Sequence, residues 1–227
     1  MKRFFLTSLV SLFLSVTTLA QDEQKCLNVI KKIDYVYDEN LIVTCIDFFW
    51  HSGVYDNFSY NNVITLNKRL LQLDPTDIET LTNTLWLLYS KWVTWKKDPV
   101  VMPDGEGKID EAFFLIDKYE KYNARNYLFY LNVALQMDAL FKYHRNDLIP
   151  FSINYYKKVV SLVPRTSSAE AVKSRLRSEL NLGHWYSFKN VDIANALVWY
   201  KEALITDPAN RVAQRRIKEI QEQGLNL

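Results

Sequence analysis

Residues 180–208 read LNLGHWYSFKNVDIANALVWYKEALITDP, and this stretch decides the fold. Ala196, Tyr200 and Ala203 follow one another at steps of four and three residues, which places them on one face of a helix. The alanines let a neighbouring backbone approach, and the tyrosine ring fills the remaining space. Pro208 then ends the helix, because the residue before a proline disfavours the α region. We therefore predict a closely packed helix pair.

The same residues match a known repeat pattern. Gly183 stands where two paired helices touch, and Tyr186 is the aromatic residue one turn further on. Pro208 follows Ala196 by 12 residues, whereas Gly183 precedes Ala196 by 13, one more than the pattern requires. The stretch resembles a tetratricopeptide repeat. This resemblance implies an all-α fold, an α/α superhelix in which each helix pair packs on its neighbours.

Earlier segments resemble the repeat more weakly. The 12-residue spacing to a proline recurs from Ser152 to Pro164 and from Val63 to Pro75, while Ala124 stands where a further proline would fall. We predict a single domain over residues 21–227, built from four helix pairs and a C-terminal capping helix. The predicted repeats span residues 38–75, 77–124, 125–164 and 167–208, and the capping helix spans residues 210–223.

The composition agrees with long helices. Of 227 residues, 48% are hydrophobic and 24% charged, which excludes a disordered chain. Only 5 are Gly and 6 Pro, whereas β-sandwiches and barrels usually contain more of both because they have many turns. Two capping boxes, Thr76-x-x-Glu79 and Ser167-x-x-Glu170, predict helix starts just after a proline.

The first 20 residues have the pattern of a signal peptide. Lys2 and Arg3 precede an apolar run, and Thr18-Leu19-Ala20 places small residues at the −3 and −1 positions of a cleavage site. An uncleaved anchor is the alternative, since residues 4–20 reach the lower limit of a membrane span. We expect cleavage, an exported chain that is periplasmic or secreted, and no integral membrane segment in the mature protein.

The mature chain is expected to be electrically neutral. Residues 21–227 hold 26 Lys and Arg against 26 Asp and Glu, because the two remaining basic residues lie in the signal peptide. A neutral chain lacks the overall basic charge of nucleic-acid-binding proteins, so we expect no nucleic-acid partner.

Cys26 and Cys45 lie on either side of a predicted connection at residues 34–40. An antiparallel hairpin would bring the two level, and an oxidising compartment would then allow a disulfide. Two buried thiols are the alternative. Two cysteines and three widely separated histidines show no zinc-ligand spacing, so we expect neither a metal nor another cofactor.

Arg177, Asn181 and His184 follow one another at steps of four and three residues on the first helix of the last repeat. The resemblance implies that first helices line a concave surface. We therefore predict these residues as a binding site for a protein or peptide, with a structural role for His184 as the alternative. Leu180 and His184 occupy two positions where carboxylate-clamping members of the family use other residues, so binding of chaperone tails is not inferred.

A second reading concerns the aromatic residues Trp86, Tyr89, Trp92 and Trp95. They are consistent with an alternative function, that of a carbohydrate-binding or hydrolytic envelope protein with a pocket near residues 97–109. Aromatic residues at helical spacing, however, more often belong to the hydrophobic core. Residues 104–111 resemble part of a calcium loop but lack two of its anchoring carboxylates. No catalytic motif is present. We expect a noncatalytic scaffold.

Overall fold

The computed structural model describes residues 20–51, 56–140, 145–188 and 192–222. All regular structure in these ranges is helical, which confirms the predicted all-α class. The chain divides into two compact units, Met1–Leu115 and Ile116–Leu227, which are described separately. Nearly all of the predicted signal peptide lies outside the described residues. None of the helices that the structure describes is long and apolar enough to cross a membrane.

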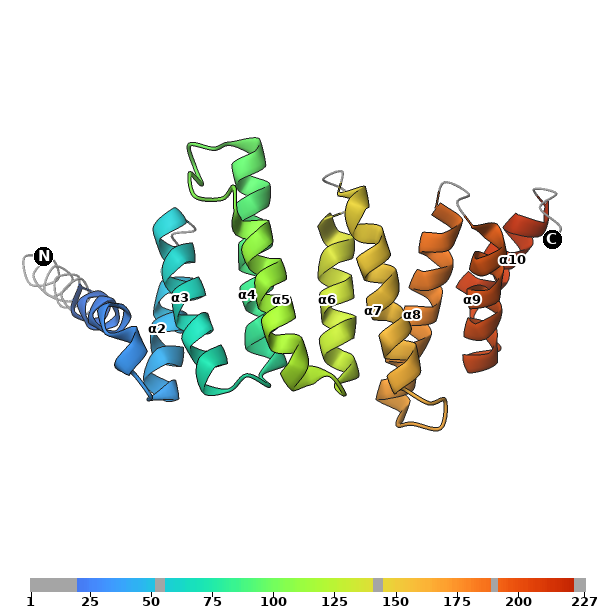
Figure 1. The fold of residues 1–227 in the computed structure, drawn as a ribbon, viewed down its shortest axis with the longest axis horizontal. Coiled ribbons are helices and arrows are strands. Elements are labelled where there is room, and N and C mark those ends of the chain that lie inside the picture. Colours follow the sequence, from blue (N-terminus) through green and yellow to red (C-terminus); the bar gives the residue numbers. More distant parts are fainter. Residues whose placement is uncertain (1–19, 52–55, 141–144, 189–191, 223–227) are drawn as a thin grey trace, which may run out of the picture. The chain divides into compact units, whose positions relative to one another are not determined.

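The N-terminal unit consists of sequential helices (Figure 1). Helix α2 packs on α3, and α3 packs on α4. Fully or almost fully buried aliphatic side chains form the core, among them Ile42, Leu66, Leu71, Leu85 and Leu88. The elements are a helix over residues 20–31, η1 (Ile33–Tyr35), α2 (Glu39–His51), α3 (Asn57–Leu73), α4 (Ile78–Lys97) and the first half of α5 (Lys108–Asn123).

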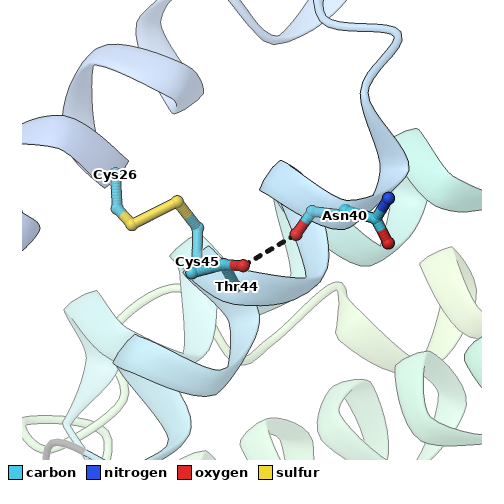
Figure 2. The surroundings of a disulfide bond; sticks show 4 residues. All are labelled: Cys26, Asn40, Thr44 and Cys45. Atoms are coloured by element: carbon cyan, nitrogen blue, oxygen red, sulfur yellow. Dashed lines mark hydrogen bonds between the residues drawn. A yellow bond between two sulfur atoms is a disulfide. The ribbon is translucent and has the colours of Figure 1, made fainter.

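A disulfide joins Cys26 to Cys45, as predicted (Figure 2). Their Cα atoms lie 5.3 Å apart, and both side chains are buried. Next to Cys45 in α2, the Thr44 hydroxyl donates to the Asn40 carbonyl, one turn earlier in the helix, at 2.8 Å. The bond ties the helix over residues 20–31 to α2 and closes a loop of about 20 residues, which stabilises a chain by about 3 kcal/mol.

The C-terminal unit continues the serial packing. Helix α6 packs on α7, α7 on α8, α8 on α9 and α9 on α10. Half of α6 is buried, in agreement with the apolar pattern all round this helix. The elements after α5 are α6 (Tyr127–Leu140), η3 (Asn146–Leu148), α7 (Ile149–Leu162), α8 (Ala169–Ser187), α9 (Ile193–Thr206) and α10 (Arg211–Glu222).

The contact between α8 and α9 is the one that the sequence predicts. A Cβ atom at Gly183 would lie only 2.6 Å from the Tyr200 ring, so only glycine fits there without a shift. Ala196 and Ala203 are completely buried, and Tyr200 is 1% exposed. Small residues therefore let the two helices approach around the buried ring.

The predicted capping boxes are each displaced by one residue. The N-cap of α4 is Asp77, whose side chain accepts from the Thr80 backbone N–H at 3.0 Å. The N-cap of α8 is Ser168, which accepts from Ala171. Thr76 instead donates its hydroxyl to Asp74 at 2.7 Å. The helix starts are correct to within two residues, but the capping side chains differ from those predicted.

Candidate partner-binding face on helices α6 and α8

Helix α8 carries the predicted binding residues on the side that it does not bury. Leu182, Gly183 and Trp185 are buried, which fixes the rotation of the helix in the unit. Arg177 and His184 are consequently exposed, and Asn181 is half-buried. The predicted stripe therefore reaches solvent.

Asp138 of α6 organises the neighbouring part of this surface. Its Oδ1 accepts from the Trp185 indole N–H of α8 at 3.0 Å, and its Oδ2 accepts from the Tyr156 hydroxyl of α7. Ser152 also interacts with this carboxyl group, and Asn181 interacts with the Tyr156 hydroxyl. One carboxyl group thus links three helices.

Opposing effects act on the pKa of Asp138. Burial raises the pKa of Asp138, although hydrogen bonds from Tyr156 and Trp185 and the charge of Arg177 act in the other direction. Burial and the adjacent Asp138 also raise the pKa of Tyr156, whose side chain is fully buried. Tyr156 therefore remains a hydrogen-bond donor at neutral pH and holds the carboxyl group in position.

His184 has different surroundings from Arg177 and Asn181. Its ring centroid lies 5.1 Å from that of Trp185 and 6.4 Å from that of Phe188. Burial of the ring and the charge of Arg216 lower the pKa of His184. The imidazole is therefore mostly neutral at pH 7, and it supplies a flat ring with a hydrogen-bonding nitrogen instead of a positive charge.

A buried ion pair fixes α8 against the end of α7. Glu179 is fully buried and accepts from the Arg175 Nε at 2.7 Å. Arg175 also donates to the carbonyls of Val160 and Val163, at 2.8 and 2.6 Å. Burial raises the pKa of Glu179, although Arg175 and Arg165 oppose this effect. Arg177, Asn181 and His184 therefore lie on a helix whose position against α7 is fixed.

The structure thus brings Arg177 and Asn181 into one cluster with Asp138 and places His184 one turn further along α8. Sequence reasoning did not select Asp138, Tyr156 or Trp185. A signal for Asp138 was present, because it is the single charged residue in the apolar segment 127–140. Of the other histidines, His51 belongs to α2 of the N-terminal unit and bonds the Asp47 carbonyl at 3.0 Å, and His144 lies outside the described residues.

The aromatic residues of α4 do not share one exposed face. Trp92 and Tyr89 are 5% and 4% exposed, so they pack in the core. Trp86 is 44% exposed, and its ring lies 5.8 Å from that of Trp50 in α2. Trp95 is half-buried, so Trp86 is the most exposed member of the predicted row, and it is joined by Trp50, which the sequence did not indicate.

The segment with the partial calcium pattern is held by cations. Asp104 pairs at 2.8 Å with Lys91, which is fully buried in α4, and Lys108 pairs with Glu111 at 2.8 Å. Burial alone would raise the pKa of Asp104, but the hydrogen bond and charge of Lys91 lower it. Within the described ranges, no group of three or more His, Cys, Asp or Glu side chains is arranged to hold a metal.

Glycine allows this segment to lie against α4. A side chain at Gly105 would collide with Trp95 and come within 2.7 Å of the Lys91 carbonyl oxygen. Met102 is also buried, at 3% exposure. The connection between α4 and α5 is therefore packed onto the unit, with Asp104 directed at a buried lysine.

Comparison with known proteins adds no family assignment. No protein-family model matches this chain, and no curated protein is significantly similar to it. The tetratricopeptide resemblance therefore rests on the residues quoted for it.

Proposed function

We propose that this chain is an exported, noncatalytic scaffold of tetratricopeptide-like helix pairs that binds a protein or peptide partner with α6 and α8. The observation that supports the proposal is the surface formed by the exposed Arg177 and the half-buried Asn181, which interact with Asp138 and Tyr156 respectively.

The chemistry of this face suits a peptide ligand. Arg177 offers a guanidinium that makes no ion pair within the described residues, while the neighbouring Arg175 is used internally. Asn181 offers an amide that both donates and accepts, as a peptide backbone requires. Asp138 links α6 to α7 and α8, so this face is already ordered before a partner binds. Binding then costs little conformational entropy, which favours affinity.

Selection of peptides against the purified mature chain tests this proposal. Arg177→Ala and Asn181→Ala are each expected to weaken the selected peptide about tenfold, since one good polar contact is worth about 1.4 kcal/mol. His184→Ala should weaken it less, because its ring is mostly neutral. Affinities would be measured by isothermal titration calorimetry.

Arg125→Ala is the matched control. Arg125 is also an exposed arginine of the C-terminal unit, but it lies between α5 and α6. Circular dichroism should show unchanged helicity in all variants. Unchanged affinity in both Arg177→Ala and Asn181→Ala, with normal helicity, would refute binding at this face.

Export is supported by the disulfide between Cys26 and Cys45, because such bonds persist mainly outside the reducing cytosol. Cell fractionation with mass spectrometry of the N-terminus tests this part. We expect a mature chain that starts at Gln21 in the exported fraction. A full-length chain retained in the cytoplasm would contradict it.

A carbohydrate-binding function is the second candidate, and the exposed pair Trp50–Trp86 favours it. Sugar rings stack on exposed aromatic faces, so this candidate predicts that Trp86→Ala abolishes retention on a glycan array or column. Arg177→Ala would then have no effect. Retention that survives Trp86→Ala would remove the carbohydrate function.

A further inference from the structure

The stretch from residue 33 to residue 67 carries charge of one sign. It contains five Asp and Glu residues and no Lys or Arg. Asp34, Asp38 and Glu39 are exposed, and none of them makes an ion pair with a residue that the structure describes. We call Asp34, Tyr35, Tyr37, Asp38 and Glu39 the N-terminal acidic surface.

Two large rings lie within this surface. Tyr35 is 83% exposed and Tyr37 73% exposed. Arg69 of α3 holds the segment in place, since its Nε donates to the Val36 carbonyl at 2.9 Å and its guanidinium lies 4.8 Å from the Tyr37 ring centroid. Arg69 is itself only 9% exposed. The acids and rings therefore form an anchored surface that needs little ordering before it binds a partner.

Helix α10 carries the opposite charge. Residues 209–218 include four Lys or Arg and no Asp or Glu. Its buried side, with Ala213 and Ile220, belongs to the hydrophobic core that α10 shares with α9. On its exposed side, Val212 is 46% exposed. We call Arg211, Val212, Arg215 and Lys218 the α10 basic stripe.

The ion pairs within α10 leave the positive charge of the α10 basic stripe available to a partner. Arg215 lies 3.6 Å from Glu219, and Lys218 lies 3.6 Å from Glu222, in pairs whose side chains are at least 41% exposed. Exposed pairs of this kind contribute little and exchange readily with other partners. Arg211 makes no ion pair within the described part of the chain.

The same opposition extends to the whole units. Residues 20–115 hold 9 Lys and Arg against 15 Asp and Glu, whereas residues 116–227 hold 17 against 11. The formal neutrality of the chain therefore conceals an excess of six negative charges in one unit and six positive charges in the other. Oppositely charged surfaces attract one another over about a Debye length, roughly 10 Å at moderate salt.

We propose that the chain associates head to tail with a second copy of itself, the N-terminal acidic surface of one copy binding the α10 basic stripe of the other. Arginines of the stripe can pair with Asp34 and Glu39 and stack on the exposed tyrosine rings, and Arg and Tyr are residues that dominate interface energetics. A second copy is favoured over another basic partner because this chain itself supplies both complementary surfaces, each anchored to its own unit.

Sedimentation velocity over a concentration series tests the proposal. At low ionic strength, about 20 mM, we expect species larger than the monomer at concentrations of tens of micromolar, the range of weak association. At about 500 mM salt they should dissociate, because screening removes the attraction. Because the two surfaces differ, each added copy leaves one of each free, and larger assemblies should follow the dimer.

Charge reversal assigns the surfaces. Asp34→Lys/Glu39→Lys and Arg211→Glu/Lys218→Glu should each be monomeric alone. The first leaves in place Asp38, whose carboxylate accepts from the Leu41 backbone N–H at 3.1 Å at the start of α2. Mixed one to one they should associate again, because each retains the native surface that its partner lacks and the reversed surfaces also match. Glu106→Lys and Arg125→Glu reverse exposed charges elsewhere and should behave like the wild type.

The outcomes are decisive in both directions. Association that is lost in each reversed variant and restored in the mixture supports the proposal, with circular dichroism showing that both variants fold. A wild type that stays monomeric at low salt overturns it. Association that persists after either charge reversal also overturns it. The same holds if the wild type does not self-associate but binds a basic helical peptide through Asp34 and Glu39.

Discussion

Buried polar contacts join helices in both units, but each unit adds a different feature to them. In the N-terminal unit, a disulfide and a buried lysine paired with Asp104 join elements whose repeat pattern is weak. In the C-terminal unit, α8 and α9 approach through Gly183 and close around Tyr200, where the repeat pattern is strongest. The N-terminal unit therefore adds a covalent link, and the C-terminal unit adds close packing of small residues, to the buried polar contacts that both contain.

The largest expected effect is that of Asp104→Ala in the N-terminal unit. It leaves the fully buried Lys91 with Asn61 but without its carboxylate partner. An unpaired buried charge costs about 3 kcal/mol or more, which denaturant unfolding would measure. The exposed Glu106→Ala is the control and should cost less than about 0.5 kcal/mol.

The pH dependence of Asp104→Ala sharpens this test. Burial already lowers the pKa of Lys91, and loss of Asp104 removes a group that raises it. A lysine whose folded pKa is depressed costs stability below that pKa, so the deficit of the variant should shrink as the pH rises toward the ordinary value of 10.5. Lys91→Met/Asp104→Ala should be more stable than Asp104→Ala. Equal stability of the two would show that the ion pair is not what holds the segment.

Loss of the disulfide is expected to rank next. Cys26→Ser/Cys45→Ser should lower the stability of the N-terminal unit by about 3 kcal/mol. Hydrogen exchange resolved by helix is the measurement, because it separates the two units. Faster exchange should be confined to the helix over residues 20–31 and its neighbours α2 and α3. Equal acceleration in α8 and α9 would break the distinction between the units.

Gly183→Ala should have a moderate effect in the C-terminal unit. The added methyl group would overlap the buried Tyr200 ring, and overpacking costs about 1–3 kcal/mol. Alanine regains up to about 1 kcal/mol of helix propensity, so we expect a net loss of about 1–2 kcal/mol in thermal or denaturant unfolding. Gly107→Ala is the control, since nothing lies within 4 Å of its added Cβ. If Gly183→Ala were as stable as this control, the close contact would not constrain how α8 packs on α9.

Much of the fold could be predicted from the sequence because its signals are local. Helix periodicity, prolines and the spacing around Gly183 indicated helix pairs, and the hairpin around residues 34–40 indicated the disulfide. Lys91 could not be placed in this way. Its partners lie 13 residues later at Asp104 and 30 residues earlier at Asn61, so its burial follows only from tertiary packing.

The candidate site was predictable only in part for the same reason. Arg177 and Asn181 follow helical spacing within one helix. Asp138 needs Tyr156 and Trp185, which lie 18 and 47 residues away in the chain, so the cluster depends on the register of three helices. The N-caps were displaced by one residue because adjacent Thr-Asp and Ser-Ser pairs both supply capping oxygens.

The smallest expected effect is absent at neutral pH and appears only under alkali. Burial, with Glu120 nearby, raises the pKa of both Tyr130 and Tyr155 in the C-terminal unit to about 12. Lys158 pairs with Glu120 and lies over both rings, 4.8 and 5.4 Å from their centroids. A raised folded pKa contributes stability that is complete below the unfolded value of 10 and is lost as the pH rises through about 12.

Absorbance at the tyrosinate band should therefore show Tyr130 and Tyr155 ionising late, together with other buried tyrosines such as Tyr156, and only while the unit is folded. Glu120→Gln should lower the pKa of Tyr130 only partway toward its ordinary value of 10, because burial is the larger cause of the increase. Tyr130→Phe/Tyr155→Phe should reduce the late phase by these two residues and flatten the loss of stability above pH 10. If both rings ionised near pH 10 in the folded wild type, their burial would not favour the neutral form, and the loss of stability under alkali would have another cause.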